Sequence, residues 1–125
     1  MKNENDSKEE MSELKIVLET LVDKLALDLV AINIKNVNPL CDYFVICSSK
    51  NERHSASLAS SLRECAMLHN LDFKKIEGKV GSEWILADLG NIVVHIFTDE
   101  GRSNYDLEGL WGDVEMVDID KIIAK

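Results

Sequence analysis

The stretch Tyr43-Phe44-Val45-Ile46-Cys47 decides the fold class, because its five residues are all apolar and stand in one unbroken row. A strand with one face in water alternates apolar and polar residues, whereas a strand that is covered on both faces is apolar throughout. We therefore expect this stretch to be a central strand of a sheet.

The residues before this strand show two further patterns. Ser7 and Glu10 have the spacing of a capping box, and apolar residues then recur at helical spacing from Met11 to Leu25. From Leu29 the period changes to two, which predicts a strand that ends before the turn at residues 36–39. A helix and a strand are thus expected ahead of residue 43.

The residues after this strand continue the alternation of helix and strand. The core stripe of a second helix, which ends near Asn70, is expected to consist of Leu58, Ala59, Leu62, Cys65, Ala66 and Met67. Another strand is expected to begin at Phe73, and residues 84–88 and 92–97 predict a β-hairpin around Gly90 and Asn91. The chain from Ser103 onward is expected to form one or two short helices.

These elements follow one another as α-β-β-α-β-β-β-α, which is typical of an α/β fold with a mixed β-sheet flanked by helices. With 125 residues, of which 46% are hydrophobic, the chain has room for one core. We expect a flexible N-terminal tail over residues 1–9 and a single domain over 10–125. The polar start is unlike a targeting signal, and no run approaches the roughly 20 apolar residues of a membrane span, so we expect a soluble cytoplasmic protein with no membrane partner.

The net charge of −9 is concentrated near the C-terminus. Residues 29–98 carry seven acids and seven bases, whereas residues 99–120 carry eight acids and one base, Arg102. Such a segment repels phosphate groups and attracts basic proteins. Direct nucleic-acid readout through it is therefore not expected, although acids also serve simply to keep a small protein soluble.

Residue types with catalytic potential are present, but their spacing does not favour catalysis. The junction between strand and helix at residues 48–51 has no glycine with which to cradle a phosphate. The sole D-x-D motif, at residues 118–120, lies in the acidic segment beyond the expected sheet, where solvated charge is the simpler explanation. We therefore expect no nucleotide cofactor.

The cysteines and histidines are equally scattered. Cys41, Cys47 and Cys65 share no C-x-x-C spacing and read as buried free thiols, and no histidine has metal-ligand spacing to a cysteine or carboxylate. A nucleophile pair would need His95 to meet Cys47 or Ser48 on a neighbouring strand, but packing in the core is the simpler role for His95. No metal and no catalytic residue are predicted.

A binding surface is indicated in the last third, where Arg102, Tyr105, Glu108 and Trp111 stand within ten residues. Tryptophan, tyrosine and arginine dominate the energetics of protein interfaces. The nearby Leu107 and Leu110 are better explained as core residues.

Several motifs together resemble the ribosomal silencing factor family (RsfS, Iojap). They are Asp42-Tyr43-Phe44-Val45-Ile46, Glu77-Gly78, Trp84-x-Leu86-x-Asp88-x-Gly90-x-Ile92-Val93-Val94-His95-Ile96-Phe97 and Arg102-x-x-Tyr105-x-Leu107-Glu108-x-Leu110-Trp111, spread over residues 11–113. The resemblance implies a nucleotidyltransferase-like fold without the catalytic motif. It also implies binding to the large ribosomal subunit through ribosomal protein uL-fourteen, which blocks subunit joining and represses translation when nutrients are scarce.

The family resemblance and the residue pattern together nominate eight partner-binding residues: Trp84, Asp88, Tyr105, Glu108 and Trp111 first, with Glu77, His95 and Arg102 in support. Trp84 and Asp88 share strand parity, so both can project from one face of the sheet. Placement of Trp84 in the core remains an alternative.

Two other functions stay open at this point. One is a divergent nucleotidyltransferase enzyme, which bound nucleotide or magnesium-dependent turnover would reveal. The other is a regulatory protein unrelated to ribosomes that forms a homodimer through an exposed strand edge.

Overall fold

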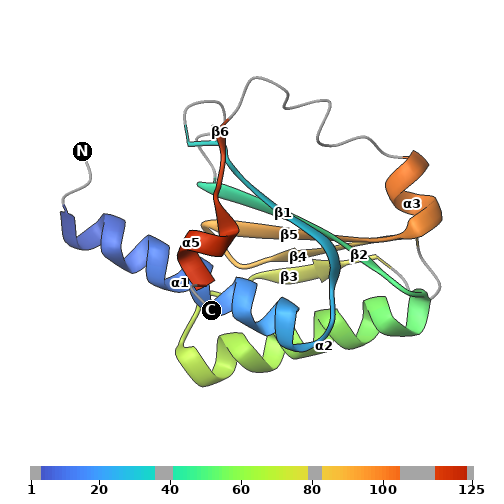
Figure 1. The fold of residues 1–125 in the computed structure, drawn as a ribbon. Coiled ribbons are helices and arrows are strands. Elements are labelled where there is room, and N and C mark those ends of the chain that lie inside the picture. Colours follow the sequence, from blue (N-terminus) through green and yellow to red (C-terminus); the bar gives the residue numbers. More distant parts are fainter. Residues whose placement is uncertain (1–3, 36–40, 79–82, 105–114, 124–125) are drawn as a thin grey trace.

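A six-stranded mixed sheet forms the centre of the computed structural model, which describes residues 4–35, 41–78, 83–104 and 115–123 (Figure 1). The strands are β1 (Leu27–Asn33), β2 (Tyr43–Ser49), β3 (Lys75–Glu77), β4 (Trp84–Asp88), β5 (Ile92–Thr98) and β6 (Glu115–Met116). Their spatial order is β3-β4-β5-β2-β1-β6, in which β2 and β5 run parallel and the other neighbours antiparallel. The predicted α/β class with a mixed sheet flanked by helices is confirmed.

The central position predicted for residues 43–47 is also confirmed. β2 lies between β5 and β1, and every residue of it except the partly exposed Phe44 is buried. The predicted hairpin is present too, since β4 and β5 pair antiparallel from Trp84 opposite Phe97 to Asp88 opposite Val93.

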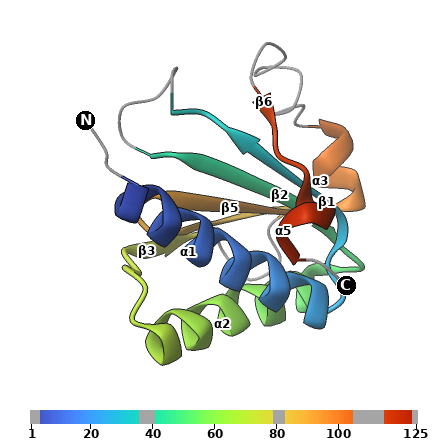
Figure 2. The ribbon, with the colours of Figure 1, turned by 60° about the vertical axis from the view of Figure 1, so that its left-hand side comes forward.

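The helices are α1 (Glu4–Asp23), α2 (Glu52–His69), α3 (Asp99–Asn104) and α5 (Ile119–Ile123). Figures 1 and 2 show α1 and α2 below the sheet, with α5 beside α1. α3 follows β5 directly and packs at the end of β5 and β2. We call the face of the sheet that α1 and α2 cover the helix face, and the opposite one the outer face.

The alternation of side chains along each strand divides the core in two. The larger cluster joins α1 and α2 to the helix face, where Val45, Cys47, Ala87, Val94 and Ile96 are almost completely buried. A smaller cluster on the outer face consists of Ile32, Ile34, Cys41, Ile46 and Phe97, with Val30, Phe44, Trp84 and Val93 packed against it. The outer face therefore carries its own apolar layer.

The second helix ends where the sequence predicts, because Asn70 adopts the left-handed conformation of a C-cap and its N–H bonds the carbonyl of Ala66. Most of the predicted stripe is buried, namely Leu58, Ala59, Leu62, Cys65 and Ala66. Met67 is the exception, since 76% of it is exposed and its assignment to the core is wrong. It follows Ala66 directly, and adjacent residues on a helix point about 100° apart.

The two ends of the chain differ from expectation. α1 begins at Glu4, so Ser7 lies inside the helix and the predicted capping box is wrong. Helix α1 therefore includes residues 4–9, and the independent motion of a tail over 1–9 stays a prediction. Near the other end, β6 pairs with Ile32 and Asn33 of β1, although the sequence analysis expects only helices there.

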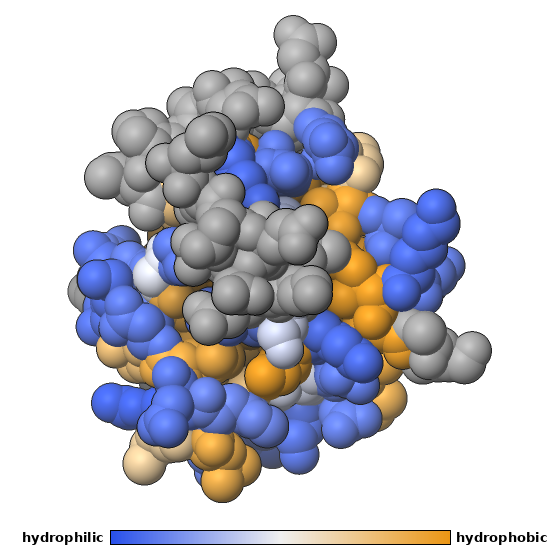
Figure 3. Space-filling view, turned by 90° about the vertical axis from the view of Figure 1, so that its left-hand side faces the viewer, coloured by the Kyte–Doolittle hydropathy of each residue, from blue (hydrophilic) through white to orange (hydrophobic). Residues whose placement is uncertain are grey.

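Polar and apolar residues share the surface of the molecule (Figure 3). Figure 3, which looks at the side that lies at the left in Figure 1, shows hydrophilic areas with hydrophobic areas between them. Among the described residues, no helix combines the length and the apolar character needed to span a membrane.

One close backbone approach allows a prediction about stability. A Cβ atom added to Gly101 of α3 would collide with the backbone carbonyl of Glu83, which already accepts a hydrogen bond from the N–H of Thr98. We expect Gly101→Ala to lower the free energy of unfolding by about 1–3 kcal/mol, because overpacking a close contact displaces backbone. Urea denaturation measures this, with the exposed Ser103→Ala of the same helix as control. Equal stability of the two variants would contradict the close approach.

Candidate protein-binding site

The outer face of β4 carries three partly exposed side chains: Trp84, Leu86 and Asp88. They alternate with Ile85 and Ala87, which are buried against the helix face. The prediction that Trp84 and Asp88 project from one face of the sheet is confirmed. Leu86 lies between them on the same face.

Two adjoining hollows lie on this face, and we call them together the sheet groove. One has a volume of about 320 Å3 and is lined by Cys41, Phe44, Lys75, Glu77, Leu86, Asp88, Gly90, Val93 and His95. The other, of about 210 Å3, is lined by Glu77, Gly78, Trp84 and Leu86. Because Glu77 and Leu86 line both hollows, the groove runs continuously over β3, β4 and β5.

The aromatic side chains of the groove support one another. The Trp84 ring stacks on Phe97 with centroids 5.2 Å apart and an interplanar angle of 27°. Its Nε1–H donates a 3.1 Å hydrogen bond to Nδ1 of His95, and the rings of His95 and Phe44 pack in a T-shaped arrangement with centroids 4.7 Å apart. Trp84 thus has a packed inner side and a partly exposed outer side, which is the geometry of a preorganised interface anchor.

His95 is only 4% exposed, and burial lowers its pKa to about 4. Since Nδ1 accepts from Trp84, the proton of the neutral ring sits on Nε2, for which the described residues provide no hydrogen-bond partner. A buried donor without a partner costs about 1–3 kcal/mol. His95 therefore acts as a packed support for Trp84, in agreement with the structural role preferred from sequence.

This histidine predicts how stability depends on pH. In the unfolded chain His95 has the ordinary pKa of 6.5, whereas in the folded chain its pKa is about 4. The stability that the neutral ring contributes is therefore fully present above pH 6.5 and is lost as the pH falls toward 4. The expected loss is roughly 2–4 kcal/mol. Denaturation series at several pH values should show that the free energy of unfolding depends less steeply on pH in His95→Gln than in the control His69→Gln, which changes an exposed histidine. Equal slopes would place the titration elsewhere.

The charged side chains lie at the rim of the groove. Lys75 and Glu77 of β3 form an exposed ion pair of 2.7 Å. On β4, Asp88 accepts a 2.9 Å hydrogen bond from the N–H of Gly90, whose φ of +80° suits a glycine in the turn between β4 and β5. Asp88 thus stabilises the turn of the hairpin. Together with Glu77 it gives the rim two carboxylates, against the one ammonium group of Lys75.

Arg102, the supporting candidate on α3, has an internal role. Its guanidinium donates to Oγ of Ser48 at 2.9 Å and to the carbonyl of Asp28 at 3.0 Å. These bonds tie α3 to β2 and β1, outside the sheet groove. The structure therefore brings together Glu77, Trp84, Asp88 and His95, but not Arg102, while Tyr105, Glu108 and Trp111 lie outside the described residues.

The sequence analysis missed part of the groove lining, chiefly Cys41, Phe44, Leu86 and Val93. Leu86 could have been predicted from strand parity, since it stands midway between Trp84 and Asp88. Phe44 was hidden by the assumption that its whole strand is buried. Cys41 gave no signal beyond its apolar character.

The catalytic alternative of a Cys-His pair is wrong in its geometry. Cys47 faces the helix face, whereas His95 packs with Trp84 and Phe44 on the outer face. Burial also raises the pKa of the Cys47 thiol to about 12, which opposes formation of a nucleophilic thiolate. The prediction that all three cysteines are buried free thiols is confirmed. Within the described parts of the chain, no three His, Cys, Asp or Glu side chains are grouped to hold a metal ion.

The fold and the groove define an α/β domain with an aromatic, acid-rimmed surface on the outer face of its sheet. The sequence matches the family model described as ribosomal silencing factor during starvation over residues 5–125. The chain therefore belongs to the ribosomal silencing factor family, which confirms the resemblance seen in its motifs.

Individual relatives support this assignment. The chain is 34% identical to ribosomal silencing factor RsfS of Halalkalibacterium halodurans, covering 89% of this chain and 95% of the relative, and 36% identical to RsfS of Bacillus subtilis, covering 86% and 91%. A mouse relative, mitochondrial assembly of ribosomal large subunit protein 1, is 31% identical over 79% of this chain and 45% of its own length. A crystal structure from Bacillus halodurans superposes with a TM-score of 0.75 at 33% identity, covering 85% of this chain and 96% of that one.

Proposed function

We propose that this protein binds the large ribosomal subunit and sterically prevents the small subunit from joining it, which represses translation under nutrient limitation. The contact on the subunit is ribosomal protein uL-fourteen, and the protein acts in the cytoplasm. Its action is occlusion, with no bond made or broken.

The observation that carries this proposal is the sheet groove with Trp84 at its edge. A partly exposed tryptophan that is fixed from behind by Phe97 and His95 can bury a large area on a partner while losing little conformational entropy. Such a surface serves binding without any catalytic group. The names of the relatives, which are silencing factors and a protein of large-subunit assembly, support the ribosome as the proposed partner.

Charge complementarity supports a basic partner. Glu77 and Asp88 stand at the groove, and Asp99, Glu100 and Asp118 are exposed in the segment 99–120. Exposed acids speed the encounter with a basic surface and reject acidic ones, while the aromatic contacts determine the lifetime of the complex. The formal charge of −9 equally disfavours binding directly to ribosomal RNA.

Titration of the labelled protein with isolated uL-fourteen, followed by fluorescence anisotropy, tests the partner assignment. We expect a saturable complex whose association slows as salt rises, since exposed charges are screened within about 10 Å at 0.1 M salt. The double variant Glu77→Gln, Asp88→Asn should reduce this salt dependence. The control variant Glu19→Gln, Glu64→Gln removes the same number of negative charges from the exposed surface of α1 and α2. Absence of binding to isolated uL-fourteen, with binding to the whole subunit retained, would assign the contact to another component.

A further inference from the structure

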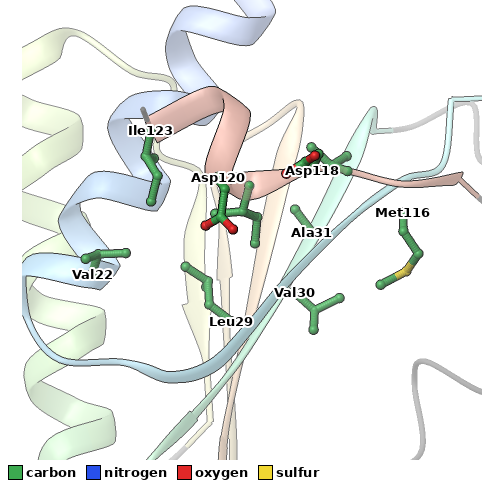
Figure 4. A pocket seen from close by; sticks show the side chains of 10 residues that line it. Val22, Leu29, Val30, Ala31, Met116, Asp118, Asp120 and Ile123 are labelled. Atoms are coloured by element: carbon green, nitrogen blue, oxygen red, sulfur yellow. The ribbon is translucent and has the colours of Figure 1, made fainter. Parts of the chain in front are cut away.

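A second groove, separate from the sheet groove, lies at the opposite edge of the sheet. It has a volume of about 460 Å3, and its lining comes from the end of α1, from β1 and from the segment 116–123. Figure 4 shows Asp120 above Leu29, with Val22 and Ile123 on one side and Val30 and Met116 on the other. We call it the edge groove, because it follows the outer edge of β1.

The described residues pair with only part of the backbone at this edge. β6 covers only Ile32 and Asn33, and one more bond joins the N–H of Val117 to the carbonyl of Ala31 before α5 begins at Ile119. Among the described residues, no strand lies beside residues 27–30 on this side. An extended peptide can pair with such an edge, while alternate side chains enter neighbouring hollows.

The register irregularity between Leu27 and Val30, together with a φ of +48° at Asp28, limits how far a partner strand can pair. Bulges at edges have this limiting effect on sheet extension. A short extended segment therefore fits the edge groove better than a long strand.

The side chains around the groove indicate the chemistry of that segment. Met116 is 60% exposed and lines the groove together with the partly exposed Leu29 and Val30. The lining carries two exposed carboxylates, Asp118 and Asp120, and no base. A second copy of this chain would bring the same carboxylates and Asp28 toward one another, which like-charge repulsion opposes.

We propose that the edge groove binds a short extended segment of a partner protein in which apolar residues alternate with lysine or arginine. The apolar side chains lie over Val30 and Met116, the backbone pairs with β1, and the basic side chains meet Asp118 and Asp120. This surface is independent of Trp84, so the protein can hold a second partner while the sheet groove is occupied.

The test uses the full chain labelled with 15N and an end-capped synthetic peptide of about seven residues in which lysine and valine alternate. Titration to millimolar peptide should shift the amide signals of residues 29–31 and 117–123 and leave those of residues 84–88 in place. Asp118→Asn with Asp120→Asn should weaken binding by at least about fivefold, whereas the control Glu19→Gln with Glu64→Gln should change it less than about twofold. Trp84→Ala should leave the peptide affinity unchanged, which separates this proposal from the ribosomal one.

Three results would overturn the proposal. The first is the absence of shifts at residues 29–31 with millimolar peptide. The second is binding as tight as that of the lysine–valine peptide by either of two altered peptides. One has glutamate in place of lysine and so lacks the basic charge, and the other is N-methylated at its valines and so lacks their backbone donors. The third is a concentration-dependent dimer in sedimentation velocity that Met116→Lys converts to monomer, because a second copy would then be the occupant.

Discussion

Replacing Trp84 by alanine should weaken binding to the large ribosomal subunit by more than tenfold. The substitution removes the aromatic surface that stacks on Phe97 and the hydrogen bond to His95, and truncation of an interface tryptophan of this kind costs about 2 kcal/mol or more of binding free energy. Equilibrium sedimentation with purified large subunits gives the dissociation constant directly.

Two comparisons make this result specific. Trp84→Phe keeps an aromatic ring on Phe97 but cannot donate to His95, so its affinity should fall between those of the native chain and Trp84→Ala. Met67→Ala changes a side chain that is 76% exposed on α2, away from the sheet groove, and should bind like the native chain. A Trp84→Ala protein that still melts cooperatively and binds normally would make Trp84 a packing residue only.

Replacing Phe97 by alanine should have the largest effect on stability. Phe97 is fully buried on the outer face, and removal of a buried phenylalanine typically costs 3–5 kcal/mol, through lost transfer free energy and the cavity left behind, so we expect a loss of about that size. Since domains of this size are stable by only about 5–15 kcal/mol, the thermal midpoint should fall sharply. Calorimetry measures the change.

The matched control is Phe73→Ala, because Phe73 is only partly buried and lies near the guanidinium of Arg63 at 5.7 Å. Its loss should cost about 1 kcal/mol, because Phe73 packs at the margin of the core and buries less area than Phe97. If the two variants were equally stable, the apolar layer on the outer face would not contribute to folding as described. Phe97→Leu should recover part of the stability and part of the subunit binding, since the Trp84 ring would keep an apolar floor.

The sequence was sufficient for those elements that leave a strong periodic pattern. The unbroken apolar row of residues 43–47 indicated the central strand, and Gly90 between two apolar runs indicated the hairpin. β6 left no such pattern, because a pairing of two residues depends on tertiary contact with Ile32 and Asn33. The predictions for the start of α1 and for the burial of Met67 were wrong for a similar reason, because packing sets the boundaries of an element and the limits of a buried stripe.

The candidate site was predictable only in part. Strand parity placed Trp84 and Asp88 on one face, but parity does not reveal that His95 lies behind Trp84 or that Glu77 on β3 borders the same hollow. Those relations come from the pairing of β3 with β4 and of β4 with β5. Arg102 illustrates the opposite case, because a residue type common at interfaces is used here to join α3 to the sheet.

The most direct measurement of the central claim is co-sedimentation of the purified protein with separated large and small subunits, followed by a subunit-joining assay. The account predicts that the protein sediments with large subunits alone and reduces the yield of joined ribosomes in proportion to the large subunits occupied, with Trp84→Ala failing in both steps. Binding to neither subunit, or binding to large subunits that leaves joining unchanged, would contradict it.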